Sequence, residues 1–268
     1  MSGNSAPAMA DADFRRLQTL MAEVSGIRLS EQKRPLVAGR LMQRLRVHGL
    51  HSYGDYVRLL DAPDQLQERR LLIDLLTTNE TYFFREPQHF EFLAEWFAQR
   101  RETTRLWSAA CSSGEEPYSL AMVASEHARG EWSVLASDLS QRMLEKAREG
   151  VYHLDQARRF PPGWLKRYCL RGIDEMEGRF AVHRQLRDRV KFQELNLTRP
   201  VPQGLGTFDL IFLRNVLIYF EPADKKSIIE RLIERLTPQG LLFVGHAESL
   251  HGLNLPLRAI RPSVYQRL

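Results

Sequence analysis

TRLWSAACSSGEEPYSLAMVASEHARG, residues 104–130, contains the first strand, loop and helix of a repeating pattern in this chain. The apolar run 104–110 is short enough for a buried strand, and the run 118–130 has helical periodicity. A second apolar run (132–138) and a second helical run (140–150) follow directly. Strands that alternate with helices are typical of a parallel sheet covered by helices. We therefore predict an α/β fold with a doubly wound, Rossmann-like sheet.

Further apolar runs extend this sheet toward the C-terminus. They predict strands at 189–197, 208–215 and 240–245, and FDLIFLRN (208–215) is the continuous apolar run of a strand buried on both faces. A helix is expected at 223–236. The last residues, 259–268, are expected to close one edge of the sheet.

Residues 151–189 interrupt the alternation and are too long for a simple connection. PPG (161–163) marks a break, IDEMEG (173–178) has the composition of a turn, and GRFAVHRQL (178–186) alternates as a strand does. We expect a small inserted antiparallel β-subdomain in this region, beside the strand 189–197.

The residues before the sheet have helical periodicity. Residues 11–75 divide into several short helical runs, which need one another to bury their apolar faces. We expect a helical N-terminal domain at 1–76, with a disordered tail at 1–12. A linker at 77–90 and the α/β domain at 91–268 follow.

Composition excludes several classes of protein. The chain has 268 residues, 43% of them hydrophobic, yet no apolar run reaches the roughly 18 residues of a membrane helix. Cys111 and Cys169 are too few for a disulfide framework or a metal cluster, so we expect a cytoplasmic protein with reduced thiols and no metal. The net charge of +5 equals the basic surplus within residues 27–50. Such a segment favours docking to an acidic partner, although a solvated helix face would have the same composition.

The loop 111–117 follows the first strand, and open parallel sheets bind ligands at the carboxyl ends of their strands. Its small residues would let the backbone approach a ligand, but Gly114 is its only glycine, so the G-x-G-x-x-G pattern of dinucleotide sites is absent. Glu115 and Glu116 begin the next helix, where acidic residues also stabilise a helix N-terminus. Because two carboxylates would repel a phosphate, a cationic ligand without phosphate fits this loop better.

Polar residues also end the later strands. Asp138, at the end of the second strand, could accept hydrogen bonds from ribose hydroxyls or form a capping box with Gln141. The ends of the third and fourth strands carry Asn196, Arg214, Asn215 and, slightly later, Tyr219. Capping alone does not explain polar groups at successive strand ends. Together they predict a pocket for a nucleoside that carries an amino acid and a positive charge, which describes S-adenosylmethionine.

Five long motifs resemble those of the CheR-type chemotaxis receptor methyltransferases: TTNETYFFRE (77–86), SAACSSGEEPYSLAM (108–122), ASDLSQRMLEKAREGVY (136–152), FDLIFLRNVLIYF (208–220) and GLLFVGHAES (240–249). The resemblance covers nearly the whole chain. It implies a helical N-terminal domain, a doubly wound catalytic domain that binds S-adenosylmethionine, and an inserted β-subdomain. It also implies methylation of glutamate side chains on the cytoplasmic helices of bacterial chemoreceptors for sensory adaptation, with S-adenosylhomocysteine as the second product.

The resemblance implies a role for each matching residue. Arg85 and Tyr219 would lie beside the transferred methyl group as catalytic residues, and no general base is needed because a glutamate is ionised at neutral pH. Glu116 would hold the methionine end of the cofactor and Asp138 its ribose. The implied cofactor-binding residues are Asn79, Thr81, Arg85, Glu116, Asp138, Asn196, Leu197, Arg214 and Asn215.

The resemblance also implies partners. Arg40, Arg44 and Arg46 fall on the helix that docks to the chemoreceptor, so the helical domain would be the receptor-docking domain. In some family members the β-subdomain binds a short peptide at the receptor's C-terminus. Here the loop GIDEMEG (172–178) departs from the family pattern, so peptide binding stays open. We expect a monomer that neither binds nucleic acid nor inserts into a membrane.

Two other functions are compatible with the same fold. A nucleic-acid methyltransferase would suit the basic segment, but no N-P-P-Y type motif follows the fourth strand and neither cysteine follows a proline. A non-catalytic module that binds the cofactor or the receptor is the second alternative. Candidate ligand-binding residues remain at every strand end, and this argues against a module that has lost its catalytic activity.

Overall fold

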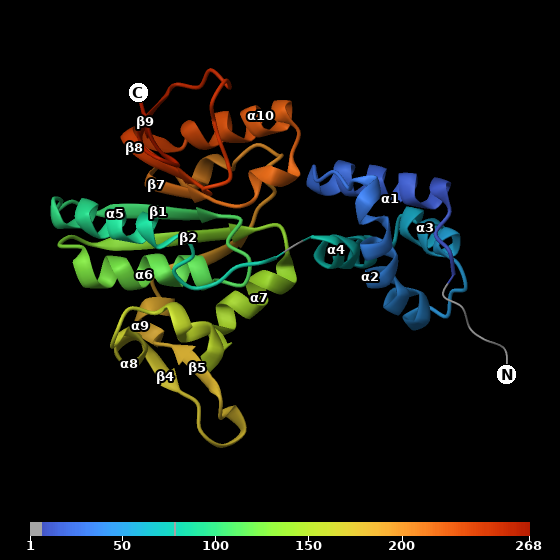
Figure 1. Ribbon diagram of the computed structural model, residues 1–268, viewed down its shortest axis with the longest axis horizontal. Coiled ribbons are helices and arrows are strands. Elements are labelled where there is room, and N and C mark those ends of the chain that lie inside the picture. Colours follow the sequence, from blue (N-terminus) through green and yellow to red (C-terminus); the bar gives the residue numbers. More distant parts are fainter. Residues whose placement is uncertain (1–6, 78) are drawn as a thin grey trace. The chain divides into compact units, whose positions relative to one another are not determined.

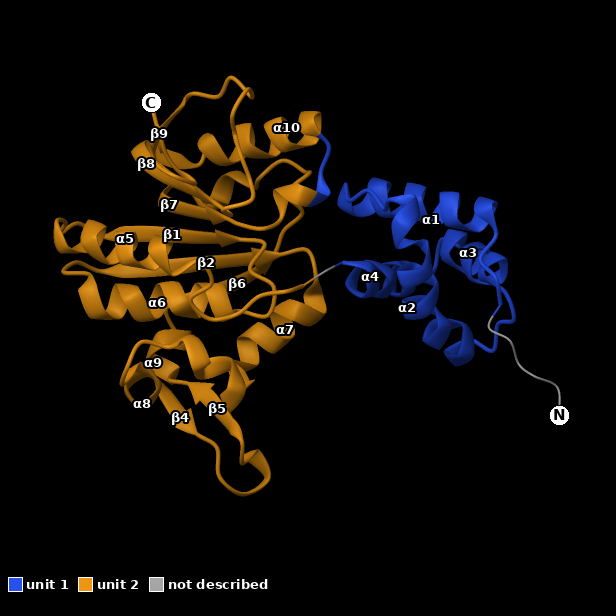
Figure 2. Cartoon of the chain, viewed as in Figure 1, with its two compact units in different colours: residues 1–78, 219–221 blue, residues 79–218, 222–268 orange. Residues whose placement is uncertain are grey.

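The computed structural model describes residues 7–77 and 79–268, which form two compact units (Figure 2). One unit consists of the described residues before Asn79 together with Tyr219–Glu221. The other consists of Asn79–Ile218 and Pro222–Leu268. The main chain therefore passes from one unit to the other inside the predicted linker.

Four helices make up the helical unit: α1 (Asp11–Ser25), α2 (Arg34–Val47), α3 (Tyr53–Asp61) and α4 (Leu66–Leu76), with the 3-10 helix η1 (Glu31–Lys33) before α2. Gly26 ends α1 in a left-handed conformation, and Pro35 fits in the first turn of α2. The apolar faces of the helices meet in a core that includes Phe14, Leu17, Leu41, Leu45 and Tyr56.

The N-terminal tail differs from its prediction. Residues 11 and 12, expected to be disordered, begin α1 instead, and residues 1–6 lie outside the described residues. No helix in the described parts of the chain combines the length and apolar character that crossing a membrane requires.

A seven-stranded sheet forms the centre of the second unit (Figure 1). Its strands are β1 (Thr104–Ala109), β2 (Trp132–Asp138), β6 (Val190–Glu194), β7 (Phe208–Leu213), β8 (Leu236–Val244), β9 (Leu257–Arg261) and β10 (Val264–Arg267). The order is β6-β2-β1-β7-β8-β10-β9, in which β10 pairs antiparallel with both β8 and β9 and the other pairs are parallel. The predicted doubly wound sheet is confirmed. Its order reverses between β1 and β7, and this is where such sheets bind ligands.

Helices cover both faces of the sheet. On one face, α5 (Pro87–Ala98), α6 (Glu115–His127) and α7 (Gln141–Glu149) share one apolar cluster with the strands. The connection from β7 to β8 runs in the opposite direction along the sheet, so its helix α10 (Pro222–Ile233) lies on the other face. The helices therefore cover the faces of the sheet, and the connecting loops lie at the carboxyl ends of β1, β2 and β7.

The inserted β-subdomain is present as a three-stranded antiparallel sheet in the order β3-β5-β4. Its strands are β3 (Val151–His153), β4 (Cys169–Arg171) and β5 (Arg179–Val182). Short helices fill the connections: η2 (Leu154–Arg159), α8 (Trp164–Tyr168), η3 (Asp174–Met176) and α9 (Arg184–Arg187). Buried Tyr152, Tyr168 and Phe180 join the insertion to the main apolar cluster. The insertion therefore shares its core with the sheet domain.

Two predicted boundaries are wrong. Helix α10 ends at Ile233, and Leu236, expected as the last residue of the helix, is the first residue of β8. The strand expected at 240–245 begins earlier, at Leu236, and TPQG (237–240) forms an irregularity inside β8, where Gln239 has a positive φ of 62°. Both conformations bury Leu236, so hydrophobicity did not distinguish them. The C-terminal stretch closes the sheet as predicted, but as the hairpin β9–β10.

Candidate active site at the carboxyl ends of the strands

The loop after β1 has a strained backbone. Ala110 and Ser112 have positive φ values of 67° and 49°, which cost energy for residues with a side chain. Gly114, with a φ of 97°, has no such penalty, and a Cβ there would lie 2.8 Å from both Ala147 Cβ and Tyr152 Oη. The loop therefore needs external hydrogen bonds to keep this shape.

Asp138, at the end of β2, supplies one of these bonds. Its Oδ2 accepts a hydrogen bond from Ser112 N at 2.8 Å, and its Oδ1 accepts one from Ser140 N at 2.9 Å. The N-cap of α7 is Ser140, whose Oγ accepts from Met143 N at 3.1 Å. The alternative role of Asp138 in a capping box with Gln141 is therefore wrong. Instead, Asp138 holds the loops that follow β1 and β2.

Glu116 lies in the first turn of α6 and is nearly buried. Ser108 Oγ donates to its Oε1 at 2.7 Å, and Arg214 Nη1 donates to its Oε2 at 3.1 Å. Burial raises the pKa of Glu116, against the opposing effect of Arg214. The structure thus brings together two of the predicted cofactor residues, from α6 and from the end of β7.

Arg214 also binds Glu86, a residue that the sequence did not single out. The Arg214 side chain is 1% exposed, and its Nη2 donates to Glu86 Oε2 at 3.0 Å and to the carbonyl oxygen of Arg85. Asn215 Nδ2 and His246 N donate to Glu86 Oε1 at 3.2 and 3.1 Å. Burial acts to raise the pKa of Glu86, but Arg214 and these donors hold it below its ordinary value. Glu86 therefore links the linker to the ends of β7 and β8.

Glu248 is a second carboxylate that the sequence did not reveal. It is 7% exposed and accepts three backbone hydrogen bonds at 2.7 Å, from Gly245 N, Asn215 N and Leu217 N. These bonds fix the turn after β7, which carries Arg214 and Asn215. The only sequence signal was an acid in GHAES (245–249), directly after a predicted strand.

Residues 79–86 of the stretch TTNETYFFRE form one side of this edge, and Thr78 lies outside the described residues. Asn79 O accepts a hydrogen bond from Ser112 Oγ at 3.2 Å, and Arg85 Nη1 donates to Glu80 O at 2.7 Å. The Arg85 guanidinium lies 5.4 Å from the ring centroid of Tyr82. Phe83 and Phe84 are buried in the main apolar cluster. Buried aromatic side chains thus anchor a segment whose polar groups stay near the strand ends; Thr81 lies in this segment.

The remaining predicted residues lie farther along the chain. Asn196, after β6, accepts hydrogen bonds at its Oδ1 from Thr198 N and Thr198 Oγ1 at 2.9 and 2.7 Å. Leu197 beside it is buried. Tyr219 ends the 3-10 helix η5 (Leu217–Tyr219) and groups with the helical unit, so its place beside the pocket stays a prediction.

The three predicted docking arginines differ in their surroundings. Arg40 Nη1 donates to the carbonyl oxygens of Leu75 and Thr77, at the end of α4. Arg44 donates to both oxygens of buried Glu68, at 2.8 and 2.7 Å. Arg46 is exposed. Arg40 and Arg44 therefore have structural roles, independent of their predicted role in docking.

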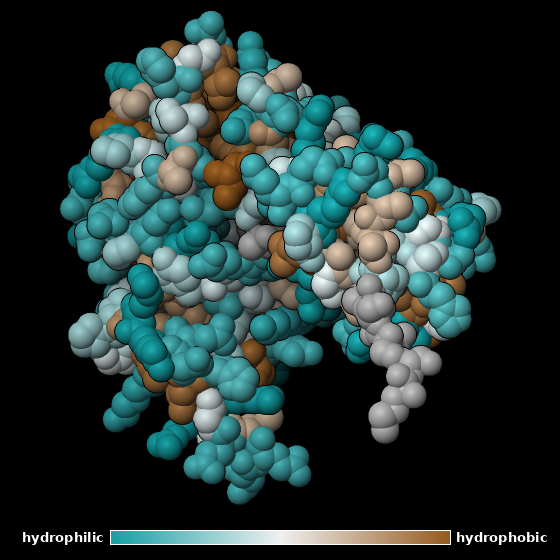
Figure 3. Space-filling model, turned by 45° about the vertical axis from the view of Figure 1, so that its right-hand side comes forward, coloured by the Kyte–Doolittle hydropathy of each residue, from teal (hydrophilic) through white to brown (hydrophobic). Residues whose placement is uncertain are grey.

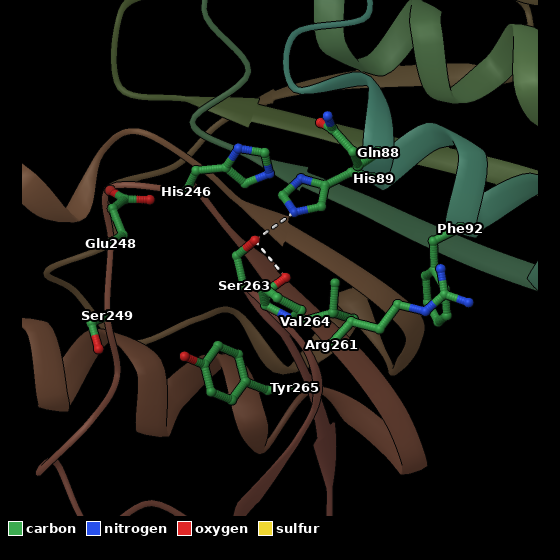
Figure 4. Close-up of a pocket in the computed structure, with 11 residues that line it drawn as sticks. Gln88, His89, Phe92, His246, Glu248, Ser249, Arg261, Ser263, Val264 and Tyr265 are labelled. Carbon is green, nitrogen blue, oxygen red and sulfur yellow. Dashed lines mark hydrogen bonds between the residues drawn. The ribbon is translucent and has the colours of Figure 1, made fainter.

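A group of possible metal ligands lies beside the site, at Glu86, His89 and His246. Figure 4 shows the two histidines. His89 Nε2 is hydrogen-bonded to Ser263 Oγ, and burial lowers the pKa of His89 to about 3, so its ring is neutral. However, Arg214 already binds Glu86 Oε2, where a cation would have to compete with it. We therefore assign no metal to this group.

The cavity next to this group is about 490 Å³ and opens between α5 and the β9–β10 hairpin (Figure 4). His89, His246, Arg261 and Tyr265 are among its lining residues, but none of the predicted cofactor residues is. The cavity is thus separate from the predicted cofactor site.

Comparisons with known proteins give matches over both units. The family model "CheR methyltransferase, all-alpha domain" matches residues 12–77, and "CheR methyltransferase, SAM binding domain" matches residues 79–265. A chemotaxis protein methyltransferase of Salmonella typhimurium is 43% identical over 249 residues, which cover 92% of this chain and 86% of the relative. Chemotaxis protein methyltransferase 2 of Pseudomonas aeruginosa is 38% identical over 260 residues, covering 94% and 92%. The two matched ranges follow the two compact units, apart from Tyr219–Glu221.

Proposed function

We infer the function from the premise that this chain belongs to the CheR methyltransferase family. It is a chemotaxis protein methyltransferase that uses S-adenosylmethionine to form methyl esters on glutamate side chains of chemoreceptors. The observation that carries this conclusion is the match of both family models, in order, over nearly all of the chain. It decides between the three functions that the sequence left open.

The residues at the strand ends fit the proposed cofactor site. S-adenosylmethionine carries a sulfonium and an ammonium group and no phosphate, which suits the carboxylate of Glu116. Arg214 Nε is buried and has no hydrogen-bond partner among the described residues. We propose that Asp138 accepts from the ribose hydroxyls and that Asn196 and Leu197 flank the adenine. Asn79, Thr81, Arg85 and Asn215 complete the pocket.

The chain's own contribution to catalysis is positioning. When bound, the cofactor supplies an electrophilic methyl group. We propose that the Arg85 guanidinium holds one oxygen of the target glutamate and leaves the other directed at the methyl group, because its planar fork matches a carboxylate. The contacts with Glu80 O and Tyr82 restrict where Arg85 can reach. The Tyr219 hydroxyl would assist, and no general base is needed for an ionised glutamate.

Replacement of Arg85 tests this role. We expect Arg85→Ala to lower kcat about 100-fold or more, since loss of a positioning contact typically costs that much. Binding of S-adenosylhomocysteine should change far less. Arg158→Ala, which removes an exposed arginine of η2, is the matched control and should leave both quantities unchanged. Unchanged turnover in Arg85→Ala would refute the proposed role.

We propose that the helical unit docks to the receptor through the basic segment 27–50. The methylated surface is acidic because every target residue is a glutamate, so opposite charge favours encounter. Arg46 is exposed and carries its charge into solvent, whereas Arg40 and Arg44 share theirs with partners inside the unit. Arg46 is therefore the first candidate for a direct contact.

We also propose a second receptor contact at the connection between β4 and β5. Leu170, Ile173 and Met176 are large apolar side chains that remain exposed at or beside this connection. On the face that Figure 3 draws, apolar residues form several separate groups. Such side chains suit the apolar residues of a peptide. The chain would act as a monomer in the cytoplasm, where the receptor helices lie.

Calorimetric titration with receptor C-terminal peptides tests this contact. We expect micromolar binding to the intact chain and at least a tenfold loss in Ile173→Asp. Ser125→Asp, on α6 outside the insertion, serves as the charge control. If no peptide binds to the intact chain, the β-subdomain has another role.

A further inference from the structure

The cofactor loop is connected to the inserted β-subdomain by two hydrogen bonds that the proposed mechanism has not used. The loop, residues 110–116, contains the strained Ala110 and Ser112 as well as Glu116. A loop in an unfavourable conformation keeps it only while the surrounding structure holds it. One of its supports, Asp138, belongs to the sheet. Two further supports come from the insertion.

Tyr152, in β3 of the insertion, makes the first connection. Its Oη donates a hydrogen bond to Ser113 O at 2.8 Å, and the side chain is essentially inaccessible to solvent. The same oxygen lies 2.8 Å from the position that a Cβ on Gly114 would take, so a side chain at Gly114 would collide with it. Burial raises the pKa of Tyr152 well above its ordinary value, so the hydroxyl stays protonated and can donate.

Gln156, in η2, makes the second connection. Its Nε2 donates to Glu115 Oε1 at 3.0 Å, while its Oε1 accepts from His153 N at 3.1 Å. The other oxygen of Glu115 accepts from Ser113 Oγ at 2.7 Å. Glu115 is 1% exposed and directly precedes Glu116, so its side chain fixes the start of α6 from inside the protein.

The linker side of the pocket is attached to the same insertion. The Phe83 ring lies with its centroid 4.9 Å from that of Tyr152 and 4.8 Å from that of Phe160. Phe84 N donates to Ser119 Oγ at 3.0 Å, and Ser119 Oγ donates to Glu115 O at 2.7 Å. Two walls of the proposed pocket, the linker and the loop, therefore share one support.

We propose that Tyr152 and Gln156 are positioning residues for S-adenosylmethionine: they hold the loop 110–116 so that Glu116 can meet the methionine end. This inference rests on the proposed cofactor roles of Glu116 and Asp138. It assigns to the insertion a task in cofactor binding that is separate from any peptide contact. Neither side chain touches the reacting atoms, so the effect should fall on cofactor affinity and spare the chemical step.

The test compares variants that remove only the connecting groups. Tyr152→Phe keeps the ring and loses the hydroxyl, and Gln156→Met keeps the length and loses the amide. We expect each to weaken binding of S-adenosylhomocysteine about fivefold to tenfold in calorimetry, the size of one lost buried hydrogen bond. The KM for S-adenosylmethionine should rise by the same factor, with kcat and the KM for receptor unchanged.

Two matched controls lie elsewhere in the insertion. Tyr168→Phe removes a hydroxyl that donates to Glu126 on α6, and Gln185→Met changes an exposed glutamine of α9. Both should bind the cofactor product like the unchanged chain. If Tyr168→Phe weakens binding as much as Tyr152→Phe does at a similar loss of thermal stability, the role of Tyr152 is merely structural and the inference is overturned.

Asp138→Asn and Glu116→Gln separate this inference from the proposed function. If both bind the cofactor product normally, the proposed cofactor site is wrong. If both lose affinity while Tyr152→Phe and Gln156→Met do not, the cofactor site stands and the positioning role of the insertion falls.

Discussion

At the residue scale, the site depends on buried or largely buried carboxylates that hold the backbone and the Arg214 guanidinium in place. Glu86 and Glu116 share Arg214, and Glu248 binds the turn that carries it. A buried charge is costly unless it is paired and hydrogen-bonded, and each of these groups is. The arrangement fixes Arg214 without a flexible surface contact.

Glu248→Gln tests this support. The amide has one acceptor oxygen for the three backbone N–H groups that Glu248 now satisfies, and its NH2 group would face a donor. We expect a loss of about 2–3 kcal/mol in the free energy of unfolding. Cofactor affinity should fall as well, because Arg214 and Asn215 lie in the released turn. Chemical denaturation and calorimetry measure the two effects.

Ser249→Ala is the control for Glu248→Gln, since it changes the next residue and removes one hydroxyl. It should lower stability by much less. Equal stability of Glu248→Gln and the unchanged chain would show that solvent can replace the carboxylate.

At the scale of the element, α2 has a structural role within the helical unit, apart from any role in binding a partner. Arg40 caps the end of α4, and Arg44 binds Glu68, which also accepts from Tyr56 Oη at 2.7 Å and lies 3.1 Å from His48 Nε2. Glu68 is 5% exposed. Two of the four arginines on this helix thus join α2 to α4.

The pH dependence of unfolding follows from Glu68. Burial acts to raise its pKa, but the hydrogen bonds from Arg44, Tyr56 and His48 lower it to about 2, below its unfolded value of 4.5. A depressed pKa adds stability above the unfolded value, and this stability is lost as the pH falls toward 2. The loss is on the order of 3 kcal/mol, at about 1.4 kcal/mol per pKa unit.

Urea unfolding of the chain and of Glu68→Gln between pH 7 and pH 3 measures this contribution. The variant should be less stable at pH 7, and the difference should shrink as the pH falls. A difference that stays constant with pH would mean that Glu68 is not ionised in the folded chain.

At the scale of the whole molecule, the net charge is concentrated in the segment 27–50. Interactions between exposed charges weaken as salt shortens the screening length, from about 10 Å at 0.1 M to about 3 Å at 1 M. We expect the KM for receptor to rise several-fold between 50 and 500 mM salt, while the affinity for S-adenosylhomocysteine changes little. Methylation kinetics and calorimetry measure the two.

Arg46→Glu is the control for this salt effect. It should raise the KM for receptor at low salt, and its KM should depend less on salt, without loss of stability. Arg44→Ala, in contrast, should destabilise the helical unit because it leaves buried Glu68 without its cation. If salt affects cofactor and receptor equally, charge does not guide receptor docking.

The amino-acid sequence alone was sufficient to predict the doubly wound sheet, the helical N-terminal domain and the inserted antiparallel strands. Periodicity reports which face of an element is buried, and burial drives these local choices. The same reasoning located polar side chains at successive strand ends. It failed at Leu236, where helix and strand bury the same side chain.

Only the tertiary structure revealed how those polar side chains are held. Glu86 and Arg214 lie 128 positions apart, and Tyr152 and Ser113 lie 39 apart, so no local pattern links them. A hydrogen bond or ion pair depends on distances of about 3 Å, which the packing of distant segments sets. The sequence therefore identifies candidates for cofactor binding, while the folded chain shows that the insertion and two unrecognised carboxylates support them.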